Sequence, residues 1–315
     1  MSSLLLERLI LKRDRRSYDD FPAPEREYSF SFLEQEARNQ LGLEHLGSDA
    51  QKSLGLRDLD NHITVAGALV ADRNKYPGLD MVVLENDDLY GERQQTGGVS
   101  ILQQLESAVA FFRRYYRREM VTGNLQREEI FLIPEPAFRE AVSNALVHRT
   151  WDTPSDIVLR MYPDRIEIQS PGGLPDGITE YEYIHKDLSV PRNVTLATLF
   201  LRLGLIEKLG TGIRRILHSY EGQYVQPDFD FSPHSMTVIL PVLNQKPDLT
   251  KSEFEVIRVL KGRQNLSRTE ISELTGYSRS KLSSLLKNLV NKNILKVTGA
   301  GRSTRYQLTE NGKTL

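Results

Sequence analysis

Three polar residues recur at every fourth position of one short stretch. Glu140, Asn144 and His148 share this spacing, so on a helix they form a single stripe. A carboxylate, an amide and an imidazole in register could form a metal–phosphate site, although an ordinary half-exposed helix can show the same pattern. The apolar residues of the stretch fall on the other side, where a core would lie: Phe138, Ala141, Val142, Ala145 and Leu146.

Two glycine turns follow this stretch. Gly172-Gly173 lies in SPGGLP, after a predicted strand hairpin at 156–162 and 165–169. Gly210-Thr211-Gly212 opens a further helix, where free backbone N–H groups and the helix dipole favour a phosphate. With helices at 136–149 and 194–202 and strands at 229–231 and 236–242, the pattern predicts an α+β sandwich. Its helices would cover one face of a mostly antiparallel sheet.

The motifs of this region resemble those of a known family. A Glu–Asn helix followed by two glycine turns is the motif order of the GHKL ATPases. In detail, the region is similar to the RecG-related transcriptional regulators, which carry REAxxNAxxHR, DRIEIxSPGGLP and IEKxGTGIxRI. This chain has REAVSNALVHR, DRIEIQSPGGLP and IEKLGTGIRRI. The resemblance covers about residues 132–243 and implies a GHKL (Bergerat-like) α/β sandwich. Upstream, SYDDFPAP and TVAGALVADRNKYPG also resemble the family.

The resemblance implies ATP and Mg²⁺ as cofactors and gives roles to individual residues. Asn144 would ligate Mg²⁺, and Glu140 would orient or deprotonate the attacking water. His148 would lie in the same cofactor site. One position departs from the pattern, because Ser170-Pro171 stands where GHKL ATPases carry the Asp that reads adenine. The resemblance also implies that the phosphates contact Gly210, Thr211 and Gly212. The nucleotide base would contact Gly172 and Gly173.

Two interpretations of this region stay open at the level of sequence. It could bind a nucleotide or another ligand, or it could be a structural or dimerising domain. The sequence has no GxxxxGK[ST] motif, and GAGRST at 299–304 lacks the lysine. The sequence therefore carries no helicase motor motif of this kind. Regulation is the primary expectation, and a GHKL ATPase coupled to DNA transactions is the alternative.

The C-terminal segment is basic and has its own order of elements. Residues 248–315 carry 13 Lys and Arg against 6 Asp and Glu, a net charge of +7, within a chain of net charge −1. Helices at 252–261, 268–275 and 279–291 precede strands at 294–297 and 304–308, with Ser267 and Glu270 as a capping box. This is the order of a winged helix-turn-helix, in which the second helix of the pair enters the major groove of DNA.

The residues expected to contact double-stranded DNA lie on the 279–291 helix and on the hairpin tip. A winged helix that contacts protein is the alternative. Because a single winged helix covers one half-site, a homodimer is expected. The predicted DNA contacts are Ser278, Arg279, Ser280, Lys281, Ser283, Lys287, Arg302 and Arg305.

Composition limits the remaining choices. The chain has 315 residues and no cysteine, which excludes thiolate chemistry and fits a reducing cytoplasm. No apolar run approaches the about 18 residues of a membrane span. The family usually begins with an AlbA-like domain, whereas here 17 residues precede Tyr18, so the chain is either a short form or a fragment.

The expected organisation has four parts. An α/β segment at 1–125 contains helices at 4–16, 31–41 and 99–118 and strands at 63–71 and 79–85. The GHKL-like domain follows at 126–243. A polar linker at 244–250 leads to the winged helix at 251–315.

Overall fold

The computed structural model describes most of the chain. The described residues are 17–24, 27–85, 90–121, 127–175, 177–186, 188, 190–206, 210–243, 249–263, 265–309 and 312–313. The helix predicted at 4–16 and most of the linker predicted at 244–250 lie outside them. The described residues divide into two compact units. The N-terminal unit comprises residues up to Ser219 together with Asp228–Leu240, and the C-terminal unit comprises Tyr220–Pro227 and Pro241–Leu315.

A mixed six-stranded sheet forms the centre of the N-terminal unit. Its strand order is β2-β1-β5-β6-β8-β7. β1 pairs parallel with β5, whereas β1–β2, β5–β6 and β7–β8 pair antiparallel. The strands are β1 (Leu79–Leu84), β2 (Tyr90–Gln95), β5 (Ile157–Met161), β6 (Arg165–Pro171), β7 (Asp228–Phe231) and β8 (Ser235–Pro241).

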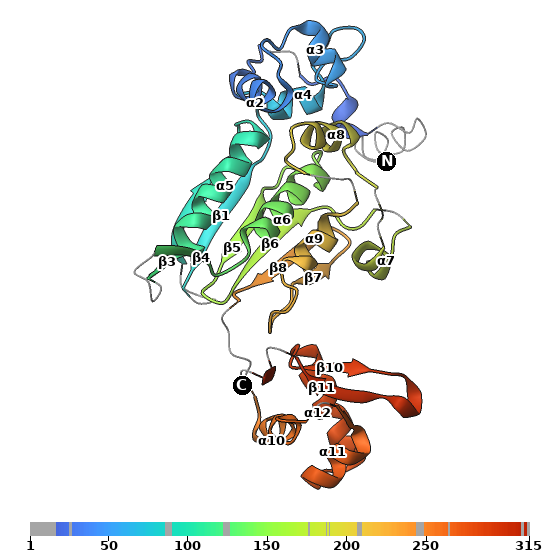
Figure 1. Cartoon of the computed structure of the whole chain (residues 1–315). Helices are drawn as coiled ribbons and strands as arrows, with labels where there is room; N and C mark the ends of the chain where they lie inside the picture. The colour runs from blue at the N-terminus through green and yellow to red at the C-terminus, as the bar shows by residue number, and fades with distance from the viewer. Residues whose placement is uncertain are drawn as a thin grey trace. The chain divides into compact units, whose positions relative to one another are not determined.

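Three helices lie side by side on one face of this sheet (Figure 1): α5 (Ile101–Tyr116), α6 (Glu135–His148) and α9 (Gly212–His218). The alternating burial of β5 and β6 matches this cover, because every second side chain is buried. Aromatic stacking joins α5 to α6, with the rings of Phe112 and Phe138 4.3 Å apart. The helix predicted at 99–118 is therefore confirmed, and its apolar positions form the core.

The remaining elements of the N-terminal unit are short. A two-stranded hairpin, β3 (Arg117–Val121) and β4 (Arg127–Phe131), connects α5 to α6. The other elements are the 3₁₀ helix η1 (Tyr18–Asp20), α2 (Ser31–Leu41), α3 (Ser48–Ser53), α4 (Val65–Val70), α7 (Glu180–His185) and α8 (Val194–Arg202).

The strand predicted at 63–71 was wrong. The residues Val65–Val70 form α4, in which every residue is buried. Thr64 caps the helix by accepting a hydrogen bond from the backbone N–H of Gly67 at 3.1 Å. A Cβ at Gly67 would lie 2.4 Å from the carbonyl oxygen of Leu56, so glycine allows this close approach. A continuous apolar run does not distinguish a buried strand from a buried helix.

The C-terminal unit contains three helices and a small antiparallel sheet. The helices are α10 (Lys251–Leu260), α11 (Arg268–Thr275) and α12 (Arg279–Asn291). The sheet order is β10-β11-β9, with β9 (Leu266–Ser267), β10 (Leu295–Thr298) and β11 (Arg305–Leu308), and the 3₁₀ turn η2 (Gly301–Ser303) precedes β11. The predicted capping box of Ser267 and Glu270 is confirmed at the start of α11.

One segment from the middle of the chain completes the C-terminal unit. Tyr224 packs against the core formed by α10, α11 and α12. Asn293 Nδ2 donates to the carbonyl oxygen of Gln223 at 2.7 Å. The residues Tyr220–Pro227 therefore belong structurally to the C-terminal unit, although strands β7 and β8 of the N-terminal unit follow them.

None of the described helices is long and apolar enough to cross a membrane.

Candidate functional site

The polar stripe of α6 faces α9. Glu140 is buried, and Asn144 and His148 are half-buried. The apolar residues on the other side of α6 are buried as expected. Because α6 packs directly on α9, the stripe is the contact surface between two helices.

Contacts from α9 engage two members of the stripe. Arg215 Nη1 lies 3.1 Å from Glu140 Oε2, where it forms a hydrogen-bonded ion pair. Gly212 is the first residue of α9, and a Cβ built on it would lie 2.5 Å from Asn144 Nδ2 and 2.6 Å from Glu140 Oε1. The second glycine turn therefore lies directly against the stripe.

Two small cavities adjoin the stripe. One has a volume of about 50 Å³ and includes Asn144, His148, Gly210 and Gly212 in its lining. The other has a volume of about 20 Å³ and includes His148, Gly172 and Gly173. His148 lines both cavities, so its side chain lies between the two glycine turns. Both volumes are far below the about 300–1,000 Å³ of pockets for drug-sized ligands.

His148 is electrically neutral near pH 7. Burial, together with the nearby positive charge of Arg192, lowers its pKa from 6.5 to about 4. Arg192 itself donates to Thr150 Oγ1 at 2.6 Å and to the carbonyl oxygen of Gly173 at 2.8 Å. A neutral imidazole beside a guanidinium gives this part of the site a positive charge.

The first glycine turn is packed against neighbouring atoms. Gly172 has φ +109°, and a Cβ there would lie 2.0 Å from Arg192 Nη1. A Cβ on Gly173 would lie 2.6 Å from the carbonyl oxygen of Ser232. Ser170, which stands where an adenine-reading Asp is expected, donates its hydroxyl to the carbonyl oxygen of Ala145 at 3.2 Å. This serine fastens the turn to α6.

Arg149, the last residue of the REAVSNALVHR motif, is buried and structural. Its guanidinium lies 4.2 Å from the centre of the Trp151 ring. Nη2 donates to the carbonyl oxygens of Thr153 and Ser155 at 3.2 and 2.5 Å. Burial lowers the pKa of Arg149 to about 10, so it remains charged at neutral pH. The arginine holds the loop that follows α6.

Magnesium with a bound nucleotide does not fit these residues in the present conformation. A metal–phosphate group would have to lie between the glycine turn and Asn144, yet a single added carbon there would already overlap Asn144 and Glu140. The carboxylate of Glu140 is paired with Arg215. The larger cavity is about 50 Å³, whereas pockets for drug-sized ligands measure about 300–1,000 Å³.

The two glycine turns and strands β5 to β8 lie in the part of the chain that resembles a GHKL/HATPase-like domain. Residues 155–240 match the family model described as "Putative ATP-dependent DNA helicase recG C-terminal". The predicted resemblance to the RecG-related, GHKL-like family is thus confirmed for this segment. No curated protein matches the chain.

A solved structure shares the fold. The DIP2311 protein from Corynebacterium diphtheriae is 18% identical, with a TM-score of 0.64, and the similarity covers 98% of this chain and 68% of that one. At this identity the likeness concerns the fold alone. The family match is consistent with nucleotide binding as a property of the class.

The residues predicted to contact DNA lie at the start of α12 and on the β10–β11 hairpin. Arg279, Ser280, Lys281 and Lys287 are exposed. Ser278 caps α12 by accepting from the backbone N–H of Lys281. Leu282, Leu286 and Leu289, on the other side of α12, are buried in the core. The helix therefore presents a polar, basic face.

Several of these side chains already have partners. Lys281 Nζ lies 3.7 Å from the centre of the Tyr277 ring. Ser283 Oγ accepts from Arg268 Nη1 at 3.1 Å, and Arg305 Nη1 pairs with Glu270 Oε2 at 2.7 Å. The side chain of Arg302 lies outside the described part. Arg268 was missed by sequence reasoning, although its position beside the capping serine of α11 was available as a signal.

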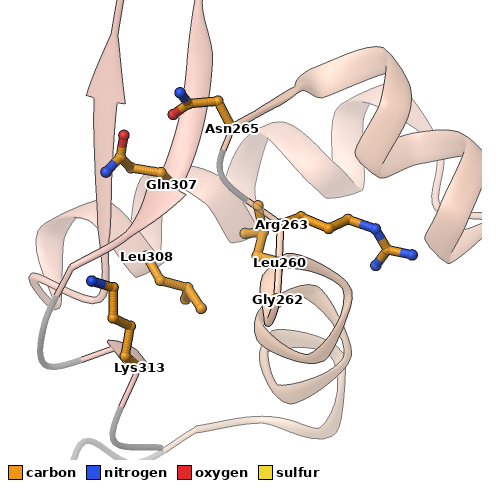
Figure 2. A pocket seen from close by; sticks show the side chains of 7 residues that line it. All are labelled: Leu260, Gly262, Arg263, Asn265, Gln307, Leu308 and Lys313. Atoms are coloured by element: carbon orange, nitrogen blue, oxygen red, sulfur yellow. The ribbon is translucent and has the colours of Figure 1, made fainter.

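The C-terminal unit also has a hollow, which is lined by other residues than this face. Figure 2 shows it between the end of α10, β11 and Lys313. None of the described residues that line it belongs to α12. This hollow is therefore separate from the predicted DNA contacts.

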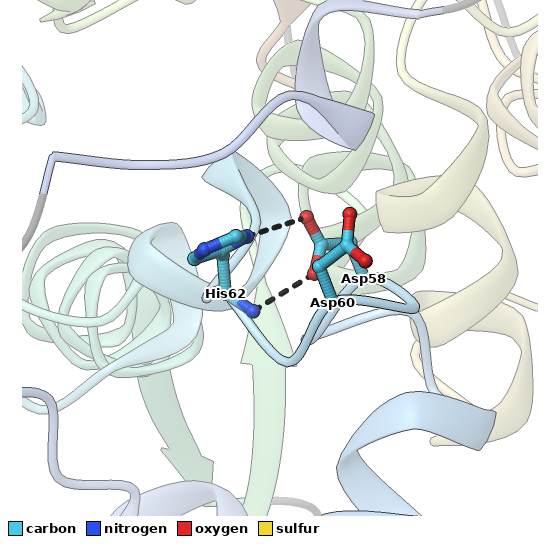
Figure 3. Close-up of side chains that lie close together, drawn as sticks. All are labelled: Asp58, Asp60 and His62. Atoms are coloured by element: carbon cyan, nitrogen blue, oxygen red, sulfur yellow. Dashed lines mark hydrogen bonds and ion pairs between the residues drawn. The ribbon is translucent and has the colours of Figure 1, made fainter.

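An acidic cluster on the N-terminal unit is explained by local structure. Asp58, Asp60 and His62 lie within 4.8 Å of one another (Figure 3). Asp58 accepts from the backbone N–H of His62 at 2.8 Å and pairs with its Nδ1 at 3.2 Å. These bonds close the turn at 58–62.

Proposed function

We propose that the chain is a DNA-binding transcriptional regulator whose C-terminal unit is a winged helix-turn-helix. The observation that carries the proposal is the first turn of α12, where Arg279 and Lys281 are exposed while Leu282 is buried. In this class of domain, the first residues of the second helix reach base edges in the major groove. The net charge of +7 on residues 248–315 supports a polyanionic partner.

The wing of this domain would be the β10–β11 hairpin. Its exposed Arg305, together with Arg302, would contact phosphate or the minor groove. Arg268 extends the basic surface, because its guanidinium lies beside Ser283 of α12. We include Arg268 among the phosphate contacts.

The GHKL-like domain would regulate this DNA contact by binding a ligand or by dimerising. A homodimer would present two recognition helices to the half-sites of a palindromic operator. The absence of cysteine is consistent with a cytoplasmic regulator. Catalytic ATP turnover is the weaker alternative, because the pairing of Glu140 with Arg215 engages the carboxylate that would activate water.

A gel-shift titration over a range of salt concentrations tests the proposal. The double variant Arg279→Ala/Lys281→Ala should bind duplex DNA more weakly, and its dependence on salt should flatten by about two units of slope. Arg258→Ala/Lys261→Ala is the matched control, because it removes the same charge from exposed positions of α10 and the residue after it. Equal binding by the wild type and the α12 variant would contradict the proposal.

A further inference from the structure

A partly buried ion pair holds α9 against the polar stripe of α6. Glu140 is 7% exposed at its side chain and Arg215 is 36% exposed. Removing one partner of a buried ion pair is strongly destabilising. The ion pair therefore opposes any movement of α9 away from α6.

Gly212 closes the remaining space at the start of α9. There is less than the room of a methyl group between its Cα and the side chains of Asn144 and Glu140. Mg²⁺ keeps an octahedral shell at about 2.1 Å and usually retains several waters. Such a shell cannot enter between Asn144 and Gly212 while α9 remains in this position.

The neighbouring cavities lead to the same conclusion. Asn144, Gly210 and Gly212 line a cavity of about 50 Å³, and His148 lines it as well. This cavity is much smaller than the about 300–1,000 Å³ of a pocket for a drug-sized ligand. A ligand with a phosphate chain therefore requires α9 to move.

We propose that α9 is an intramolecular latch, which occupies the metal–phosphate position of the GHKL-like site and is held there by the Glu140–Arg215 pair. In the latched state Glu140 anchors α9 and does not activate water. Breaking the pair opens the site. The latch goes beyond the proposed DNA-binding function, since it concerns the N-terminal unit alone and stands whether or not α12 binds DNA.

Calorimetric titration of the full chain with Mg·ATP tests the latch. Arg215→Ala should bind Mg·ATP at least tenfold more tightly than the wild type. Arg215→Lys keeps a cation and should resemble the wild type. Arg214→Ala is the matched control, because it removes the same group from an exposed position of the same helix. Adding Asn144→Ala to Arg215→Ala should abolish the gain.

Hydrogen exchange provides an independent readout that needs no ligand. In Arg215→Ala, the amides of α9 should exchange faster, whereas those of β5 and β6 should keep their protection. If Arg215→Ala does not fold, Glu140→Gln removes the same charge pair with an isosteric group and should show the same two effects.

Two results would overturn the latch. Tight Mg·ATP binding by the wild type, equal to that of Arg215→Ala, would mean that the site is open. Folded Arg215→Ala and Glu140→Gln proteins without any gain in binding would mean that α9 is a permanent structural element. The gel shift of Arg279→Ala/Lys281→Ala tests the proposed DNA-binding function separately, so failure of the latch and failure of that function are distinguishable.

Discussion

Asn193 Nδ2 donates a hydrogen bond to the carbonyl oxygen of Val147 at 2.7 Å. The same nitrogen donates to the carbonyl oxygen of Arg149 at 2.9 Å, and Asn193 is completely buried. The last carbonyl groups of a helix have no hydrogen-bond partner within the helix. One amide thus satisfies two such carbonyl groups at the end of α6. This end of α6 carries His148, so Asn193 holds the candidate site in place.

Asn193→Ala should lower the free energy of unfolding by about 2–3 kcal/mol, because it leaves buried carbonyl groups unsatisfied. Urea denaturation measures the change. Val194→Ala is the control, since the neighbouring Val194 is 49% exposed and should cost less than about 0.5 kcal/mol. If the free energy of unfolding fell by the same amount in both variants, the hydrogen bonds of Asn193 would not contribute to stability.

The stability of the N-terminal unit should depend on the protonation of Asp19. This buried residue accepts from the backbone N–H of Leu196 at 2.9 Å at the start of α8. Burial raises the pKa of Asp19 from 3.8 to about 6. Between these two values the folded protein binds more protons than the unfolded chain, so stability falls as the pH rises from about 4 to about 6. A shift of about two units corresponds to about 3 kcal/mol.

Asp19→Asn removes this dependence and should be measured against the wild type by urea denaturation at several pH values. The difference in unfolding free energy between wild type and variant should decrease from pH 4 to pH 6 and stay constant above. His148, whose pKa is lowered to about 4, has the opposite effect of raising stability with pH. It is common to both proteins and cancels in the difference. Parallel curves would refute the assignment to Asp19.

Glu270→Gln should strengthen DNA binding by the C-terminal unit. Glu270 pairs with Arg305 at 2.7 Å, and the substitution leaves Arg305 available to a phosphate. One additional phosphate contact steepens the salt dependence by about 0.9 in slope. Glutamine still completes the capping box with Ser267, so stability should change by less than about 1 kcal/mol. Salt-titrated gel shifts measure the effect, with Glu273→Gln on the same helix as a control of equal charge. If both variants bind alike, Arg305 makes no phosphate contact.

Two substitutions of Asn293 should separate a hydrogen bond from a backbone requirement. Asn293 has φ +51° and donates to the carbonyl oxygen of Gln223. Asn293→Gly keeps the left-handed conformation at little strain and should cost about 1 kcal/mol for the lost hydrogen bond. Asn293→Ala should cost about 1 kcal/mol more, because alanine adopts this conformation with strain. The rates of hydrogen exchange of the α12 and β10 amides measure the loss of stability in both variants. An alanine variant as stable as the glycine variant would exclude the backbone contribution.

The elements with clear periodicity or capping signals were predictable from sequence. The apolar spacing of α5, the stripe of α6 and the capping serines of α11 and α12 all follow from local rules. The family motifs also identified the glycine turns that lie beside His148. These features depend on residues close together in the chain.

Interactions between distant residues could not be predicted in this way. Arg215 lies 75 residues from Glu140, and nothing in IEKLGTGIRRI indicates which of its two adjacent arginines turns towards α6. Asn193 resembles a helix cap in the sequence, yet its side chain binds the end of another helix. The hairpin of β3 and β4 and the edge strand β2 were also missed, because their charged residues obscure the alternation of a strand.

The chain passes between its two units three times, because the residues Tyr220–Pro227 belong to the C-terminal unit while Asp228–Leu240 returns to the other. A gene fusion that exchanged everything after β8 would therefore leave behind Tyr224, which packs on the C-terminal core. A functional chimaera would have to exchange both segments together. Recombination at a single point after β8 would therefore not transfer the C-terminal unit intact to another protein.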